Sequence, residues 1–193
     1  MLLVVDNRSH FLQDLKVCLR ELGSGIMVRS AGRQIPPEDL GQAEGIILSG
    51  GPLLLDRGCY LKEIALDLEV VIEARVPILG ICLGHQLVAE AYGSGILRCS
   101  EFINRQVSIR VLKRDPLFSG LPDTFLAWEA HAEAIAGLPD PFEHLATSEI
   151  CRYEAIRHRH RPVYGVQFHP EASGATGTQI LRNFLTICGE AAA

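Results

Sequence analysis

A cysteine lies between two glycines in the segment GICLG, residues 80–84, directly after a short apolar run. With serine in place of cysteine, this is the G-x-S-x-G pattern, in which a sharp strand-to-helix turn lifts a nucleophile to the edge of a sheet. The positive end of the following helix favours a thiolate at Cys82. A buried structural cysteine beside two glycines fits the same five residues, so this motif alone leaves both interpretations open.

A second segment, QFHPE at residues 167–171, supplies the groups that a cysteine nucleophile needs. His169 can take the thiol proton and later give it to a leaving amine, and Glu171 can fix the tautomer and charge of the imidazole. An isolated H-P-E is more often a strand-end turn with two exposed polar residues than a catalytic pair. Both motifs follow expected strands, however, and open α/β sheets place their active sites at these strand ends. The combination favours a Cys–His–Glu site.

Acyl chemistry also needs hydrogen-bond donors for the negative oxygen of its tetrahedral intermediate. The segment SGGP, residues 49–52, ends a third expected strand, and its glycines can present a bare backbone N–H to that oxygen. The N–H of Leu83, the residue after the candidate nucleophile, is the expected second donor. No G-K-[ST] follows the glycines, so SGGP is not a phosphate loop.

The elements that must position these motifs alternate between strand and helix in the first half of the chain. Apolar runs predict strands at residues 2–5, 26–29, 45–49 and 77–81, and apolar faces at helical spacing predict helices at 10–22, 60–74 and 86–92. The second half predicts strands at 106–112, 125–128, 144–147, 153–157 and 163–168, then a helix at 178–188. This order predicts one α/β domain over residues 1–193, with a mostly parallel central sheet, helices on both faces and a smaller antiparallel strand region in the C-terminal half.

Composition excludes several other classes of protein. Of the 193 residues 48% are hydrophobic and 21% charged, which excludes a disordered chain, and the net charge of −5 argues against a nucleic-acid partner. The apolar runs are far shorter than the roughly 20 residues of a membrane span, and no basic leader precedes them, so neither a membrane nor a secretory signal is expected. The six cysteines form no C-x-x-C pair. We therefore expect no metal site, and a reduced protein in the cytoplasm.

The sequence resembles the class I (triad) glutamine amidotransferases over nearly the whole chain. The resemblance rests on three motifs that follow the family's order: SGGP, GICLGHQ at residues 80–86 and VYGVQFHPE at 163–171. The resemblance implies hydrolysis of glutamine to glutamate and ammonia through a cysteine thioester, with the ammonia passed to a synthase and no cofactor in this subunit. It also implies roles for particular residues: Cys82 as nucleophile, His169 and Glu171 as its partners, Gly51 and Leu83 as oxyanion donors, and Gln86 and Gly50 as glutamine-binding residues. His131 lines either the glutamine pocket, as a substrate-binding residue, or the exit for ammonia.

Within this family, AWEAHAE at residues 127–133 resembles the W-x-S-H-x-D segment of GMP synthase glutaminase units, with Ala130 and Glu133 in place of serine and aspartate. After H-P-E, residues 172–174 replace the family's V-x-H-T. This branch implies conversion of XMP to GMP with a separate ATP-pyrophosphatase synthetase subunit that binds ATP and magnesium, because the S-G-G-x-D-S loop is absent from this sequence.

Three alternatives stay open beside the GMP synthase branch. One is the glutaminase component of anthranilate or aminodeoxychorismate synthase. Those subunits usually have S-P-G-P-G where this chain has SGGP, and Y-H-S in the segment where this chain has AWEAHAE. A free-standing γ-glutamyl hydrolase would need no partner. A catalytically silent binding or regulatory module on the same fold is the third, and the intact set of Cys82, His169 and Glu171 argues against it.

Overall fold

One sheet of nine strands runs through the computed structural model, which describes residues 1–55 and 61–192. The strands are β1 (Leu2–Asp6), β2 (Ile26–Ser30), β3 (Gly45–Leu48), β4 (Ile78–Ile81), β5 (Ile96–Val111), β6 (Thr124–Ile135), β7 (Phe142–Thr147), β8 (Ala155–His158) and β9 (Val163–Val166). The α-helices are α1 (Leu12–Glu21), α2 (Pro37–Gln42), α3 (Leu61–Glu73), α4 (Leu83–Glu90) and α5 (Gly174–Ala192). Short 3₁₀ helices follow β5 at Pro116–Phe118 and β9 at Pro170–Ala172.

The strand order is β2-β1-β3-β4-β9-β8-β7-β5-β6. The first five strands in this order are parallel, and every pair from β9 onward is antiparallel. In the central register Leu48 of β3 pairs with Gly80 of β4, which in turn pairs with Gly165 of β9. The segments that follow these three strands therefore meet at one edge of the sheet, and the predicted α/β class with its antiparallel C-terminal region is confirmed.

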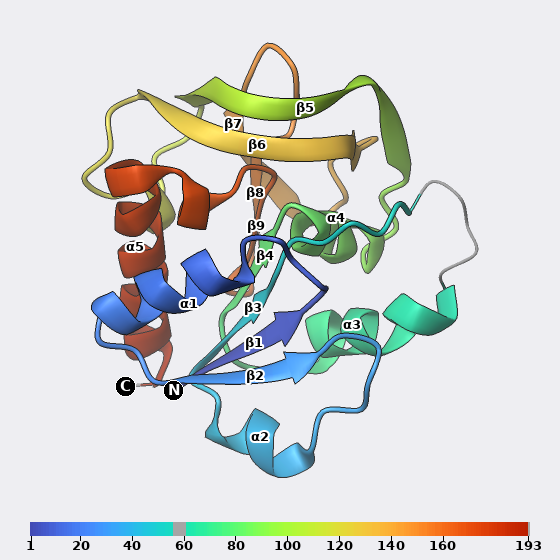
Figure 1. Ribbon diagram of the computed structural model, residues 1–193, viewed down its shortest axis with the longest axis vertical. Helices are drawn as coiled ribbons and strands as arrows, with labels where there is room; N and C mark the ends of the chain where they lie inside the picture. The colour runs from blue at the N-terminus through green and yellow to red at the C-terminus, as the bar shows by residue number, and fades with distance from the viewer. Residues whose placement is uncertain (56–60, 193) are drawn as a thin grey trace.

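Alternate side chains of the parallel strands enter two cores on opposite faces of the sheet. Leu2 and Val4 of β1 pack with α1 and α5, whereas Leu3 and Val5 pack with α3 and α4. Figure 1 shows α1 and α5 on one side of the parallel strands and α3 and α4 on the other. Strands covered on both faces have no polar side to alternate with, which is why they read as continuous apolar runs in the sequence.

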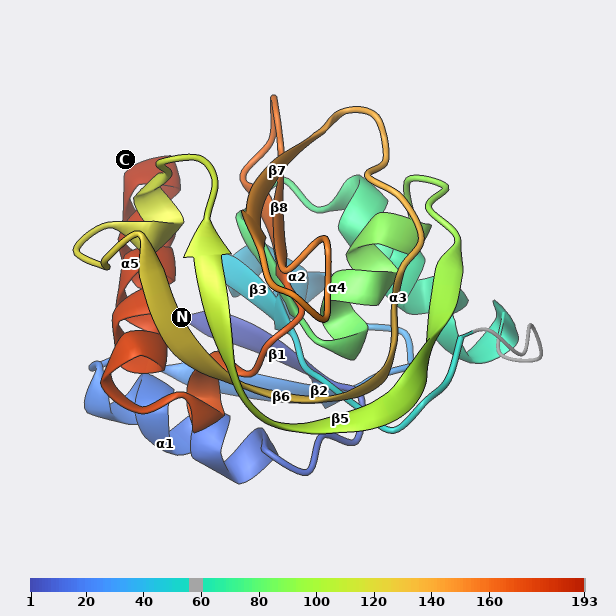
Figure 2. The same ribbon diagram turned by 90° about the horizontal axis from the view of Figure 1, so that it is seen from above.

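The β5–β6 ribbon is longer than predicted, because β5 begins at Ile96 rather than near residue 106 and β6 continues to Ile135 rather than ending near 128. Figures 1 and 2 show this curved ribbon arching over the carboxyl ends of the parallel strands. The added part of β5 has exposed Leu97 and Phe102 and a register shift before Ile103. It therefore lacks the regular apolar alternation on which the shorter prediction depended.

Three of the predicted helices have wrong boundaries. Helix α4 begins at Leu83 rather than at residue 86, because the chain turns sharply at Cys82 and enters the helix at once. Helix α5 begins at Gly174 and reaches Ala192, and α1 begins at Leu12, two residues later than expected. The start predicted for α3, residue 60, lies outside the described residues. No described helix combines the length and the apolar character that crossing a membrane requires.

Candidate active site

Cys82 lies at the turn between β4 and α4, where its backbone has φ 52° and ψ −104°. Positive φ is rare for residues with a side chain and is costly unless the surroundings enforce it. The two flanking glycines allow the turn: a Cβ on Gly80 would lie 2.3 Å from the Gly84 carbonyl oxygen, and one on Gly84 would lie 2.2 Å from that of Leu48. The segment thus forms the strained elbow that its sequence predicts.

His169 and Glu171 lie beside this elbow. The Nδ1 of His169 is 2.9 Å from Oε1 of Glu171, and both side chains are buried. A Cβ on Gly50 would be 2.8 Å from Cε1 of His169 and 3.5 Å from Cβ of Cys82, so the imidazole and the cysteine flank the same glycine. Burial alone would lower the pKa of His169, but the facing Cys82 and Glu171 raise it to about 10. The surroundings therefore favour an imidazolium next to Cys82.

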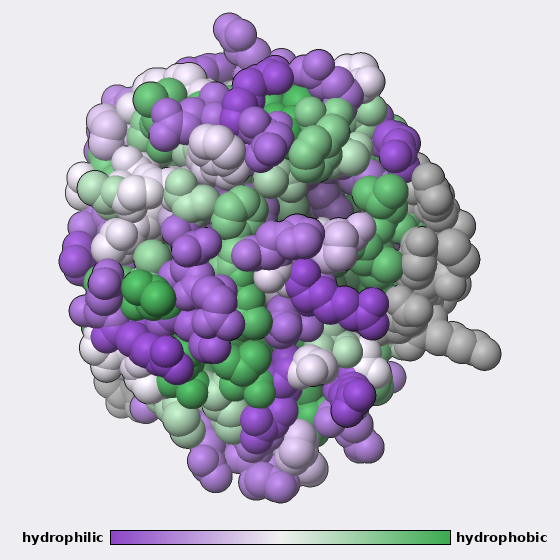
Figure 3. Space-filling view, in the orientation of Figure 1, coloured by the Kyte–Doolittle hydropathy of each residue, from purple (hydrophilic) through white to green (hydrophobic). Residues whose placement is uncertain are grey.

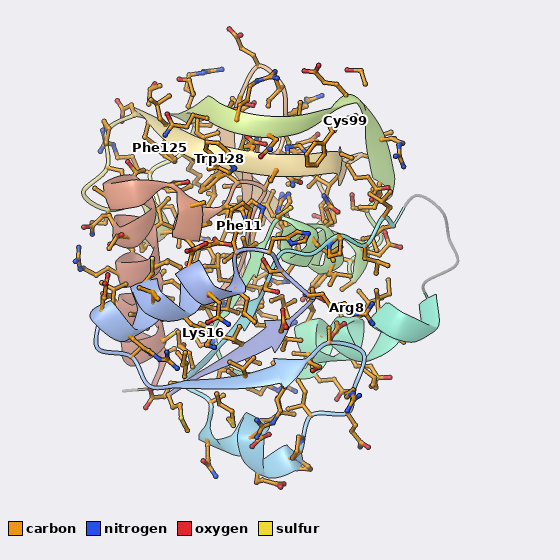
Figure 4. All side chains as sticks on the ribbon, in the orientation of Figure 1. Arg8, Phe11, Lys16, Cys99, Phe125 and Trp128 are labelled. Atoms are coloured by element: carbon orange, nitrogen blue, oxygen red, sulfur yellow. The ribbon has the colours of Figure 1, made fainter. Side chains whose placement is uncertain are left out.

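The His169 backbone and ring are fixed by groups from outside its own segment. Its N–H donates to the Trp128 carbonyl of β6 (2.8 Å), and its carbonyl accepts from the Ser173 hydroxyl (2.6 Å), which in turn accepts from the Trp128 N–H (2.8 Å). Ser173 thus has a structural role in the segment that departs from the family pattern. Phe11 packs on the imidazole with ring centroids 4.6 Å apart. Figure 4 shows Phe11 where α1 begins, with Trp128 on β6 above it.

The candidate oxyanion donors lie on either side of the elbow. Gly51 is held against β1: a Cβ there would be 2.2 Å from the Asn7 carbonyl oxygen and 3.0 Å from the Leu83 side chain. Asn7 donates from its side chain to the Ser49 carbonyl (3.0 Å) and from its N–H to the Ser49 hydroxyl (2.9 Å). Leu83 is the first residue of α4, so its N–H has no acceptor within the helix.

For the glutamine hydrolysis that the family resemblance implies, the variant Gly51→Val is expected to lower kcat by about 10²-fold, the usual effect of losing one oxyanion donor. The valine side chain has no room beside Asn7, so the loop that carries the Gly51 N–H must move. The matched control is Gly41→Ala in α2, where a Cβ meets nothing within 4 Å, and its kcat should not change. Steady-state glutamate release measures both. Equal activity of the two variants would contradict a role of Gly51 as donor.

A cavity of about 320 Å³ opens at the elbow, and most of the predicted site residues line it. Cys82, Leu83 and Gln86 come from the elbow and α4, and Gly51, His131 and His169 come from three other segments. Gly50 and Glu171 lie behind His169 rather than on the cavity wall. Figure 3 shows this face of the molecule hollowed below the β5–β6 ribbon, with apolar surface at the rim. The volume suits a small polar substrate.

The structure gives Gln86 and Glu133 clear positioning roles in the cavity wall. The Gln86 side-chain amide donates to the Glu133 carbonyl (2.8 Å) and to Oε1 of Gln167 (3.3 Å), so both of its donors are already used within the protein. The Glu133 carboxylate accepts from the Leu55 N–H (2.7 Å) and so ties β6 to the segment that carries Gly51. His85, next to these residues in sequence, faces Gly165 instead, and full burial lowers its pKa to about 3. His85 is therefore a packed core residue and not part of the cavity wall.

Sequence reasoning missed Phe11, Phe102 and Ser9, which also line the cavity. The apolar spacing of residues 10–22 assigned Phe11 to the buried face of a helix. Because α1 begins only at Leu12, Phe11 leaves that face and reaches His169. No signal in the sequence marks Phe102, an exposed aromatic on the extended part of β5.

A buried ionisable pair includes His131 of the cavity wall, where Nε2 of His131 contacts Oε2 of Glu129 and Nδ1 is 2.9 Å from the Glu133 carbonyl oxygen. Burial alone would lower the pKa of His131, but hydrogen bonds with Cys99 and Glu129 raise it to about 10. Burial and the nearby Glu129 raise the pKa of Glu154 well above its ordinary range. The surroundings therefore favour an imidazolium at His131 beside Glu129 and disfavour the charged form of Glu154.

The variant Glu129→Gln is expected to lower the free energy of unfolding at pH 7 by about 3 kcal/mol, because it leaves the His131 imidazolium buried without a counter-charge. The pKa of His131 is raised from 6.5 to about 10, so the stabilisation by the pair is complete below pH 6.5 and is lost as the pH rises through 10. Urea denaturation at pH 7 and pH 10 should therefore show a smaller defect at pH 10.

Glu154→Gln is the matched control. Folding raises the pKa of Glu154 and so disfavours its carboxylate, which costs stability above the pH at which the unfolded chain ionises it; a neutral amide should therefore leave the stability at pH 7 unchanged or higher. Equal losses in the two variants would contradict this assignment of charges.

Within residues 1–55 and 61–192 no group of three or more His, Cys, Asp or Glu side chains is arranged to hold a metal ion. The chemistry available at the cavity is that of a thiol, an imidazole paired with a carboxylate, and backbone N–H groups. This fold and arrangement are those of the class of α/β enzymes that act through a cysteine at a strand–helix elbow.

The chain belongs to the class I glutamine amidotransferase family, whose model (Glutamine amidotransferase class-I) matches residues 3–188. The glutamine-hydrolysing GMP synthase subunit of Pyrococcus abyssi is 40% identical, with 98% of this chain and 100% of that protein covered. The protein of the same name from Methanocaldococcus jannaschii is 36% identical, with 98% of each chain covered.

Solved structures of related proteins have the same fold as this chain. The crystal structure of a putative GMP synthase subunit from Thermoplasma acidophilum superposes with a TM-score of 0.89 at 32% identity, covering 98% of this chain and 94% of that one. A glutamine amidotransferase from Thermotoga maritima superposes with a TM-score of 0.79 at 18% identity, covering 97% of both chains, and shares the fold. The family resemblance expected from the three sequence motifs is confirmed.

Proposed function

We propose that this protein is the glutaminase subunit of a two-subunit GMP synthase. It hydrolyses glutamine to glutamate and ammonia, and the ammonia passes to a separate synthetase subunit that converts XMP to GMP. The observation that carries the proposal is the meeting of Cys82, His169 and the Gly51 loop at one small cavity. The similarity to the glutamine-hydrolysing subunits of archaeal GMP synthases over the full length of the chain supports the choice of branch.

The proposed reaction uses the groups of the cavity in order. The Cys82 thiolate attacks the side-chain carbonyl of glutamine, and the N–H groups of Gly51 and Leu83 hold the oxygen that becomes negative. The C–N bond breaks as the His169 imidazolium donates its proton to the leaving nitrogen, which releases ammonia and leaves a thioester. A water molecule, deprotonated by His169, attacks the thioester and releases glutamate. Glu171 holds the imidazole in the required tautomer throughout.

The glutaminase step needs no cofactor, since a thiolate and an imidazolium supply both the nucleophile and the proton. We assign ATP and magnesium to the separate ATP-pyrophosphatase synthetase subunit, which activates the nucleotide. A thiol nucleophile stays active only while it is reduced, so we place the complex in the cytoplasm. The five described cysteines carry no disulfide, in agreement with that compartment.

Glutamate release from glutamine, measured for this chain alone and with a GMP synthetase subunit, ATP and XMP, tests the proposal. We expect the complete mixture to stimulate the release strongly and to form GMP in proportion. Release that is indifferent to the mixture would retain the glutaminase and move the partner elsewhere, with chorismate-using synthases the next to test. High turnover without any partner would favour a free-standing hydrolase instead.

A further inference from the structure

A second cavity, of about 460 Å³, lies where the strand order of the sheet reverses. β1 has β2 on one side and β3 on the other, and ligands of open α/β sheets bind outside the carboxyl ends of strands at such a point. We call it the switch-point cavity; its walls include Arg8, Arg33, Leu53, Leu54, Ile64 and Asp67. Its volume is in the range of small-molecule sites.

The switch-point cavity is separate from the glutamine cavity. Pro52, Leu53, Leu54 and Leu83 line both and form the wall between them, whereas Cys82 and His169 line only the glutamine cavity. A molecule in the second cavity would therefore contact the back of the loop that carries Gly51 without reaching the thiol.

Asp67 of α3 supplies an unsatisfied polar group in this cavity. Its side chain is only 2% exposed, and its Oδ2 has no hydrogen-bond partner among the described residues. Burial raises the pKa of Asp67 to about 6, opposed by the backbone N–H of Gly32. A buried carboxylate oxygen without a donor is costly, and native proteins rarely leave one so. A ligand hydroxyl would supply the missing donor.

Two guanidinium groups accompany this carboxyl. Arg8 and Arg33 are exposed, and neither has a hydrogen bond or an ion pair with the residues that the structure describes. Arg8 follows β1 with φ 64°, a conformation that is strained for arginine and tends to occur at functional sites. Figure 4 shows Arg8 between the ends of β1 and β2 and helix α3, away from Phe11. Guanidinium pairs are the usual partners of phosphate.

We propose that the switch-point cavity binds a nucleoside monophosphate, with the phosphate on Arg8 and Arg33, a ribose hydroxyl on Asp67, and the base against the apolar wall of Leu53, Leu54 and Ile64. All three kinds of group that such a ligand carries then have a matching partner. The proposal is argued only from the residues that line this cavity, and it does not depend on the glutaminase activity.

Isothermal titration calorimetry of the isolated chain with GMP, guanosine and inorganic phosphate tests it. We expect GMP to bind more tightly than either fragment. Arg33→Gln should weaken GMP binding by about tenfold, the loss expected for one charge-assisted hydrogen bond to phosphate. Asp67→Asn should weaken binding of GMP and guanosine but leave phosphate binding unchanged. Arg114→Gln, which removes an exposed arginine paired with Asp123, is the matched control and should bind GMP normally.

A second binding experiment shows which of the two cavities holds the nucleotide. Protein in which Cys82 has been covalently labelled with an electrophilic glutamine analogue should still bind GMP, because the thiol does not line the switch-point cavity. Loss of GMP binding on labelling would place the nucleotide in the glutamine cavity and overturn the proposal. Equal affinities for GMP and phosphate, or equal effects of Arg33→Gln and Arg114→Gln, would overturn it too. Calorimetry does not require turnover, so an inactive glutaminase would leave this test intact.

Discussion

The variant Cys82→Ala is expected to lose glutamine hydrolysis by at least ~10⁴-fold, because no other group in the cavity can form the acyl intermediate. Among the described cysteines, Cys82 alone lines the cavity. Its backbone is already at positive φ, and alanine there has the same Cβ, so the elbow keeps its shape. Glutamate release measures the loss, and circular dichroism with thermal unfolding checks the fold.

The matched control is Cys188→Ala. Cys188 is packed in the core, its thiol lies against Gly45, and burial raises its pKa to about 12. This variant should lose stability but keep kcat within about twofold, because a core cavity costs folding free energy without touching the site. An electrophilic glutamine analogue should label Cys82 alone among the six cysteines. Appreciable turnover by Cys82→Ala, or label spread over several cysteines, would rule out Cys82 as nucleophile.

The sequence was sufficient to predict the parts of the site that follow buried strands. Cys82, His169 and the Gly50–Gly51 turn each come directly after an apolar run in the parallel part of the sheet. Parallel strands place their carboxyl ends at one edge, so the order of the runs predicts which segments meet. The apolar runs are also the parts of the sequence with the strongest periodic signal.

The remaining parts of the site depend on contacts that no local pattern encodes. Phe11 reaches His169 only because α1 begins at Leu12, two residues later than predicted, and Glu133 ties β6 to Leu55 across 78 positions of the chain. Asp67 looks like a polar residue on an amphipathic helix, yet the packing of α3 buries it. Each of these residues acquires its position from tertiary packing, which overrides what its own segment predicts.

The role of His169 needs a more discriminating test than that of Cys82, because three other histidines lie at or near the cavity: His10, His85 and His131. His85 is excluded as a base by its full burial and its contact with Gly165, and His131 is already engaged with Glu129 and the Glu133 carbonyl. Nε2 of His169, in contrast, has no partner among the described residues while Nδ1 is paired with Glu171. The free ring nitrogen is therefore the one available to Cys82.

The variant His169→Asn is expected to lower kcat by about 10³-fold or more, since activation of the nucleophile and protonation of the leaving amine are lost together. Labelling of Cys82 by the electrophilic analogue should slow as well, but only at neutral pH, because alkaline solution supplies thiolate without a base. The labelling defect should therefore shrink between about pH 7 and pH 9, whereas the defect in kcat should persist because ammonia still leaves without a proton donor.

The contrast between these two readouts separates a base from a residue that merely supports the fold. The exposed His160→Asn variant is the control and should match the wild-type protein in both measurements. A structural role of His169 would instead slow labelling equally at every pH, because a distorted elbow misplaces the thiolate whatever its protonation. A loss of less than about tenfold in kcat would make His10 and His131, which also line the cavity, the bases to test next.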